Sequence, residues 1–299
     1  MNATAGATGG VDPASRCEVR ELACEARDGH RFTLHARIPP DAHTALLWLP
    51  ALGIAARHYA VFADALATRG IATLLHEWRG HGSSSLRAAR GRDWGWRALL
   101  EDDLAASTAM LATLLPGARR LIGGHSLGGQ LACCRLALSQ GDADAVWLVG
   151  SGSPYWRAFP PRQRLWLPLA YRFLPWLARR AGYLPGRRIG FGGNEACGVI
   201  QDWAVAATAG RYAARGLDAD LEAALIGIDA QIDAVVLADD WLAPAGSLHF
   251  LLSKMPAAAD TVTVLDAAAL GAPADHYAWM KQPTAVIDAL LDSGARSRA

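Results

Sequence analysis

The stretch Leu121-Ile-Gly-Gly-His-Ser-Leu-Gly-Gly-Gln-Leu-Ala-Cys-Cys134 places one serine between two short runs of glycine. Apolar residues precede the serine and an apolar helical run follows it, so the pattern predicts a strand, a sharp turn and a helix. Glycines at 124 and 128 permit a turn too tight for side chains. Such a turn would expose the hydroxyl of Ser126 at the edge of a sheet, where it could act as a nucleophile. The alternative is a glycine-rich turn with a structural role only.

The segments on both sides of this stretch alternate between short apolar runs and amphipathic helical stretches. The turn signal Asp28-Gly29 predicts an antiparallel hairpin over 17–26 and 30–38. Further strands are expected at 44–49, 71–76, 120–123, 145–149, 232–238 and 261–265, and helices at 59–69, 98–115, 127–139, 244–254 and 283–291. This alternation predicts an α/β fold, with a mostly parallel central sheet and helices on both faces.

The alternation stops at Ser151, and from there to about Leu225 the sequence predicts helices and loops but no strand. The simplest organisation is an α/β core over 16–153 and 226–299, with a helical cap inserted at 154–225. Residues 1–15 have neither a basic start nor an apolar run, so we expect a disordered leader and no signal peptide.

Composition sets the class of protein. The 299 residues are 52% hydrophobic with a net charge of +1, which allows a large core and gives no general attraction to nucleic acid. Five cysteines in no metal-binding or redox spacing indicate reduced, mostly buried thiols in a cytoplasmic protein. No stretch has the length and apolar character of a membrane-spanning helix.

A serine hydroxyl is a weak nucleophile unless a base activates it, and an acid usually orients that base. In this fold class the chain order is nucleophile, acid, base. His276 follows the last expected strand and is the expected base, whereas His249 lies inside an expected helix. Asp240, at the end of the preceding strand, is the preferred acid, and its neighbour Asp239 is the rival. The alternative is that both aspartates merely cap a helix.

Three other residues near these motifs are expected to have no catalytic role. Asp275 adjoins the expected base in sequence, so its side chain is expected to point elsewhere. His125 and His81 are interpreted as structural residues.

With these residues the chain resembles the α/β-hydrolase superfamily over about residues 30–292. Gly124-His-Ser-Leu-Gly128 matches its nucleophile elbow, and Glu77-Trp-Arg-Gly-His-Gly-Ser-Ser84 is similar to its Asp-x-Arg-Gly-x-Gly-x-Ser segment, with Glu in place of Asp. Asp239–Pro244 and Asp275–Tyr277 are similar to its acid and base loops. The likeness is greatest to bacterial predicted α/β hydrolases of undefined substrate. It is more distant to lysophospholipases and monoacylglycerol lipases.

The resemblance implies an oxyanion hole formed by the backbone N–H groups of Leu52 and Leu127. The loop that carries the first donor reads Pro50-Ala-Leu-Gly53 and departs from the usual His-Gly-x. The implied activity is hydrolysis of a carboxylic ester through an acyl-enzyme, without a metal or an organic cofactor. An acyltransferase or thioesterase using the same residues is one alternative, and a non-catalytic binding protein is another. The sequence leaves the oligomeric state open.

The expected cap is rich in arginine and aromatic residues and has no acidic residue between Tyr155 and Asn194. Three interpretations stand. The aromatics pack on the core beneath solvated arginines, or an amphipathic surface meets lipid head groups, or the arginines bind an anionic group such as a phosphate of coenzyme A or of a carrier protein. A nucleic-acid partner is not expected. The cap should cover Ser126, and Trp166 and Trp176 should select the acyl chain of the substrate.

Overall fold

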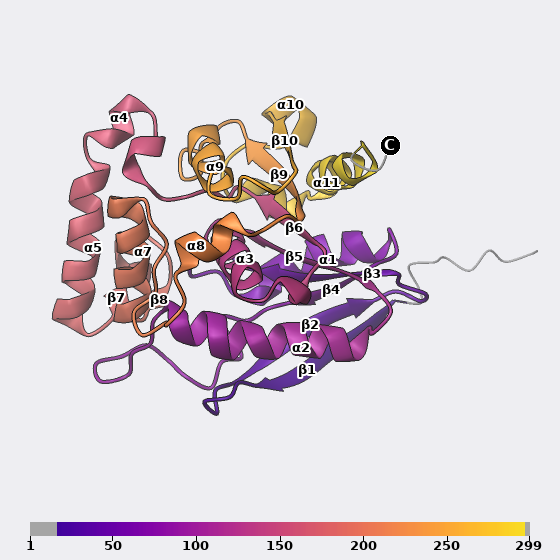
Figure 1. The fold of residues 1–299 in the computed structure, drawn as a ribbon, viewed down its shortest axis with the longest axis horizontal. Helices are drawn as coiled ribbons and strands as arrows, with labels where there is room; N and C mark the ends of the chain where they lie inside the picture. Colours follow the sequence, from indigo (N-terminus) through magenta and orange to yellow (C-terminus); the bar gives the residue numbers. More distant parts are fainter. Residues whose placement is uncertain (1–16, 297–299) are drawn as a thin grey trace, which may run out of the picture.

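In a computed structural model that describes residues 17–296, eight strands form one sheet (Figure 1). In spatial order the strands are β1 (Glu18–Glu25), β2 (Arg31–Ile38), β4 (Ile71–Leu75), β3 (Thr44–Leu49), β5 (Arg119–His125), β6 (Ala145–Val149), β9 (Gln231–Leu237) and β10 (Asp260–Leu265). β1 pairs with β2 and β2 with β4 in antiparallel fashion, and all the other pairs are parallel. The expected leader, residues 1–15, lies outside the described residues.

The helices connect these strands in the expected alternation. They are α1 (Ala60–Ala67), α2 (Leu104–Leu114), α3 (Leu127–Leu138), α4 (Pro161–Arg164), α5 (Leu167–Ala181), α6 (Gly186–Ile189), α7 (Cys197–Ala209), α8 (Leu221–Ile226), α9 (Ala245–Leu252), α10 (Ala267–Leu270) and α11 (Thr284–Arg296). A π-helical segment, Ala98–Asp103, precedes α2, and short 3-10 helices occupy Ala56–Tyr59, Gln140–Asp142, Trp156–Ala158 and Ala278–Lys281. No helix of the described chain is long and apolar enough to cross a membrane.

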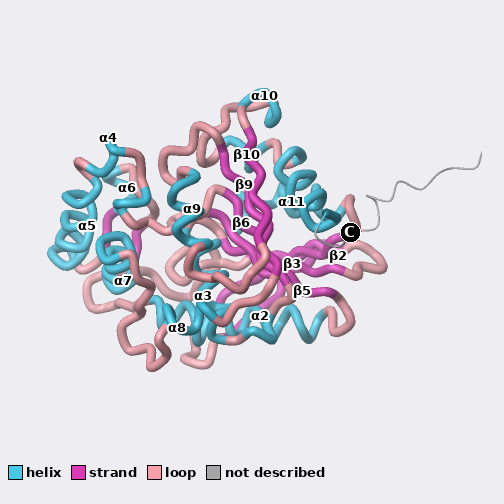
Figure 2. Tube along the Cα trace, turned by 45° about the horizontal axis from the view of Figure 1, so that its top comes forward, coloured by secondary structure: helices cyan, strands magenta, loops and turns pink. Residues whose placement is uncertain are grey.

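The sheet separates two hydrophobic cores because the side chains of a strand alternate between its faces. In β3, Leu47 and Leu49 pack into one core together with residues of α2, α3 and α8, whereas Leu46 and Trp48 pack into the other with residues of α1 and α11. Figure 2 shows α2 and α3 on one side of the strands and α11 on the other. Strands buried on both faces explain the near-continuous apolar runs of the sequence.

The observed strand bounds lie within two residues of those expected, and β3 and β6 coincide with them. β5 runs to His125, the residue before the serine, and not only to Gly123. The expectation of no strand between 151 and 225 was wrong. β7 (Leu184–Pro185) and β8 (Asn194–Glu195) pair antiparallel, and two residues per strand are too few to leave a periodic pattern.

The residues between β6 and β9 carry α4 to α7 to one side of the sheet, as Figures 1 and 2 both show. α7 approaches the loop that precedes α2 very closely: a Cβ on Gly198 would lie 2.6 Å from the carbonyl oxygen of Trp94. The buried carboxylate of Asp202, also in α7, accepts the N–H of Trp96 at 2.8 Å. A glycine and a buried hydrogen bond therefore attach this segment to the rest of the molecule.

Candidate active site

Ser126 occupies a strained turn between β5 and α3. Its backbone has φ 55° and ψ −120°, a conformation that costs an ordinary residue about 1–3 kcal/mol. The flanking glycines make the turn possible, because a Cβ on Gly124 would lie 2.3 Å from the carbonyl carbon of Gly128. A Cβ on Gly128 would lie 2.1 Å from the oxygen of Leu49. The strand and the helix thus cross too closely for side chains, which is why glycine stands on both sides of the serine.

His276 and Asp240 meet although they are 36 residues apart in the chain. Nδ1 of His276 lies 2.6 Å from Oδ2 of Asp240, and both side chains are buried. The other carboxylate oxygen, Oδ1, accepts the N–H groups of Leu242 and Ala243 at 2.9 and 3.1 Å. Both oxygens of this buried carboxylate are therefore satisfied, and one of them holds the imidazole in a defined orientation.

The other sequence candidates lie apart from this pair. Asp239 is exposed, and His249 is exposed on α9. Asp275 accepts the N–H groups of Tyr277 and Ala278, both at 2.8 Å, so its carboxylate caps a turn. Of the two neighbouring aspartates, the structure brings only Asp240 to the histidine.

Leu52 and Leu127 line the same cavity as Ser126, and the backbone N–H of neither donates a hydrogen bond within the described part of the chain. The second lies at the first turn of α3, where the helix dipole favours negative charge. Two hydrogen bonds hold the loop that carries Leu52. Nε1 of Trp78 donates to the carbonyl of Pro50 at 2.8 Å, and the backbone N–H of Ala51 donates to Oη of Tyr59 at 2.9 Å. The loop is thus positioned without its usual glycine.

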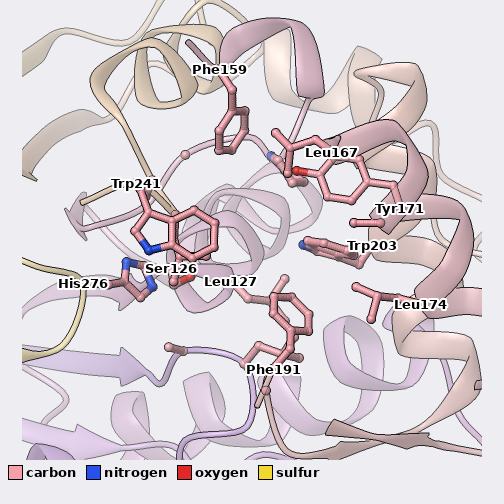
Figure 3. A pocket seen from close by; sticks show the side chains of 18 of the residues that line it. Ser126, Leu127, Phe159, Leu167, Tyr171, Leu174, Phe191, Trp203, Trp241 and His276 are labelled. Atoms are coloured by element: carbon pink, nitrogen blue, oxygen red, sulfur yellow. The ribbon is translucent and has the colours of Figure 1, made fainter. Parts of the chain in front are cut away.

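A cavity of about 330 Å³ extends from Ser126 toward α5 and α7 (Figure 3). Ser126 and His276 lie together at one end in Figure 3, and Leu52 and Leu127 also line the cavity, whose lining is mainly apolar. Its larger apolar side chains are Phe159, Trp166, Leu167, Tyr171, Phe173, Leu174, Ile189, Phe191, Trp203, Trp241 and Leu242. No Asp, Glu, Lys or Arg of the described chain lines this cavity. Trp166 takes part as expected, but Trp176 does not. It stands 53% exposed on the outer side of α5.

Two histidines for which the sequence predicts structural roles, His125 and His81, make specific contacts beside the cavity. His125 is fully buried, with its ring centroid 4.4 Å from that of His276 and Nδ1 2.8 Å from Oη of Tyr59. Burial, together with the nearby His276, lowers the pKa of His125 well below its usual value, so it stays neutral. Nε2 of His81 lies 3.1 Å from the carboxylate of Glu195, in β8. No local sequence pattern signals either contact.

A second serine–histidine–aspartate arrangement lies in the Glu77–Ser84 segment and its surroundings. Nε2 of His30 lies 2.8 Å from Oγ of Ser84, and Nδ1 lies 2.8 Å from Oδ1 of Asp103. All three residues are buried, none lines the cavity, and Ser84 already accepts the N–H of Gly80 at 2.9 Å. Arg79 binds the same aspartate. This cluster therefore holds a loop together and is not open to a substrate.

Comparisons with known proteins identify the family and the fold of the chain. A model of the family described as serine aminopeptidase, S33, matches residues 40–190, which are 151 of the 299 residues. No curated protein matches the chain by sequence. The residues of the described chain include no group of three or more His, Cys, Asp or Glu that could hold a metal ion.

Solved structures with the same fold cover nearly the whole chain. A hypothetical protein from Pseudomonas aeruginosa is 15% identical, with a TM-score of 0.60 over 96% of this chain and 98% of the other. A thermophilic esterase from Thermogutta terrifontis is 16% identical, with a TM-score of 0.60 over 92% and 97%. An esterase domain from Rhodothermus marinus is 17% identical, with a TM-score of 0.56 over 94% and 98%. At these identities the likeness establishes the fold.

Proposed function

The chain belongs to the serine aminopeptidase S33 family of α/β hydrolases, and from this premise we propose that it hydrolyses carboxylic esters with an uncharged, apolar acyl group, using Ser126 as nucleophile. The observation that carries the proposal is the cavity. It is apolar over most of its surface, and Ser126 and His276, the hydrogen-bond partner of Asp240, both line it. A site of this shape and chemistry suits an acyl chain.

In the first half of the reaction, Oγ of Ser126 attacks the ester carbonyl and its proton passes to Nε2 of His276. The oxyanion that forms accepts the N–H groups of Leu52 and Leu127, each worth about 3–4 kcal/mol in the transition state. Asp240 stabilises the imidazolium and keeps Nδ1 as the donor. The carbon–oxygen bond to the alcohol then breaks, and the alcohol leaves with the proton from His276.

In the second half, a water molecule replaces the alcohol. His276 takes one proton from it while the water oxygen bonds to the acyl carbon, and the same two N–H groups bind the new oxyanion. The bond from the acyl carbon to Oγ breaks, the carboxylic acid leaves, and the proton returns to Ser126. His125 stays neutral throughout, so it adds no positive charge beside the imidazolium.

The same cavity argues against a substrate with a free α-amino group, as an aminopeptidase would require. An ammonium group buried without a partner costs several kcal/mol. The described residues that line the cavity include no carboxylate to pair with it. An uncharged acyl group has no such cost.

The test compares p-nitrophenyl esters of short and medium fatty acids with leucine p-nitroanilide. We expect turnover of the esters and little of the anilide. The Ser126→Ala variant should lose nearly all ester turnover, and a fluorophosphonate should add one mass increment to the wild-type protein but not to this variant. Preference for the anilide, or retention by Ser126→Ala of more than about a tenth of the activity, would overturn the proposal.

A further inference from the structure

The outer side of α5, together with Leu165 just before the helix, carries large apolar side chains that the fold leaves in solvent. Leu165 is 82% exposed, Leu169 67%, Phe173 50% and Trp176 53%. The spacing of four and three residues places Leu169, Phe173 and Trp176 on one face of α5. The opposite face is buried, and there Tyr171 packs edge-to-face on Trp203 of α7. Figures 1 and 2 both place α5 at the outside of the molecule.

This apolar face is continuous with the mouth of the cavity. Trp166, Phe173, Ile189, Trp241 and Tyr277 all line the cavity, and all are more than 40% exposed. The rings of Trp166 and Trp241 are in contact, with centroids 5.9 Å apart. Single exposed apolar residues are ordinary on a protein surface, but a contiguous group around an opening marks an interaction site.

The charged side chains of residues 155–194, which include α5, have one sign. Eight arginines lie between Tyr155 and Asn194, where the sequence has no acidic residue, and all eight are exposed: Arg157, Arg162, Arg164, Arg172, Arg179, Arg180, Arg187 and Arg188. None forms an ion pair with a residue that the structure describes, whereas Arg37, Arg79 and Arg135 elsewhere do. Guanidinium groups bind phosphate oxygens in a bidentate manner. An exposed apolar face bordered by unpaired arginines complements a surface of anionic phosphate groups above hydrocarbon.

We propose that α5 and the arginines around it dock the protein on an anionic lipid bilayer, with the cavity mouth facing the membrane. Leu169, Phe173 and Trp176 enter the boundary between head groups and acyl chains, and Arg172 and Arg179 bind lipid phosphates. Binding to the bilayer does not require Ser126. Given the proposed function, an apolar ester would pass from the bilayer to the cavity without crossing water.

The test measures sedimentation of the full chain with phosphatidylcholine vesicles, with and without phosphatidylglycerol. We expect binding to the anionic vesicles that weakens as salt is added. Leu169→Ser and Trp176→Ala should each lower the partition coefficient about tenfold. Val264→Ser, at an exposed site on β10, should leave it unchanged. Leu169 and Trp176 do not line the cavity, so turnover of a water-soluble short ester should stay at the wild-type level in both variants.

A second pair of variants tests the charge. Arg172→Gln combined with Arg179→Gln should lower the affinity for anionic vesicles about tenfold, and Arg31→Gln on β2 should not. The docking proposal fails if wild-type protein does not bind anionic vesicles, if Leu169→Ser binds as wild type does, or if Leu169→Ser instead separates a dimer of the chain. The Ser126→Ala variant should bind vesicles normally, so failure of docking and failure of the ester chemistry are distinguishable.

Discussion

Oη of Tyr59 lies 2.8 Å from Nδ1 of His125, so the loop of Leu52 and the serine turn share one hydrogen-bonded network. The same Oη accepts the N–H of Ala51 at 2.9 Å, which leaves its own proton to donate to Nδ1. All of these atoms are buried, where an unpaired polar group costs about 1–3 kcal/mol. Tyr59 therefore positions the Leu52 loop, although it touches no substrate.

Tyr59→Phe should lower kcat about tenfold while leaving KM near the wild-type value. The Ala51 N–H would lose its acceptor, and the loop would shift away from the oxyanion that it stabilises only in the transition state. Steady-state kinetics on a p-nitrophenyl ester measure kcat and KM separately. Tyr183→Phe is the control, because no hydrogen bond of its hydroxyl occurs among the described residues. Equal losses in the two variants would contradict a positioning role.

Asp240→Asn should reduce kcat by about 10³-fold or more, because an amide cannot keep the imidazole of His276 in the required tautomer. Asp239→Asn should stay within about twofold of wild type, since that carboxylate is exposed and apart from the histidine. The two substitutions are at neighbouring positions, and each removes one carboxylate, so the variants have the same net charge. A larger loss for Asp239→Asn would show that the wrong carboxylate is paired with the base.

Trp166→Ala should change the preference among acyl chains, because its indole lines the cavity. Trp176→Ala should leave that preference unchanged, because its indole lies outside. The measurement is kcat/KM over a series of p-nitrophenyl esters of increasing acyl length, with thermal midpoints alongside. We expect the maximum to move toward longer chains for Trp166→Ala alone. An identical series for both variants would mean that the cavity does not select the acyl group.

Glu195→Gln should change how stability depends on pH. The pKa of His81 is raised: burial acts to lower it, but the charge and hydrogen bond of Glu195, with the nearby charge of Glu77, together outweigh burial. A group whose pKa is raised on folding contributes its full stabilisation below the unfolded value of about 6.5 and loses it as the pH rises through the folded value. The thermal midpoint of wild type should therefore exceed that of the variant most at low pH, by the equivalent of about 2 kcal/mol.

The His81–Glu195 ion pair also lies beside the proposed oxyanion loop. Glu195 also accepts the N–H of Gly193 at 2.8 Å, and a Cβ on Gly53 would lie 1.9 Å from that same nitrogen. The control is Glu21→Gln, whose exposed carboxylate lies near His35 and should show no such trend. A difference between wild type and Glu195→Gln that stays constant from acid to alkaline pH would contradict the argument.

The sequence by itself determined the order of strands and helices, the strained turn at Ser126 and the two loops that carry Asp240 and His276. These features depend on periodicity and on glycine or proline within a few residues, so a single chain segment encodes them. Tertiary structure alone decided which aspartate meets His276, that Tyr59 reaches His125 across 66 residues of chain, and that Trp176 faces outward. Asp240 and His276 follow β9 and β10, which pair in parallel, and Tyr59 and His125 lie beyond or at the ends of β3 and β5, which pair in the same way. Trp176 faces outward because α5 packs against α7 through its opposite face. Strand order and helix docking are set by the whole core, and no local pattern specifies them.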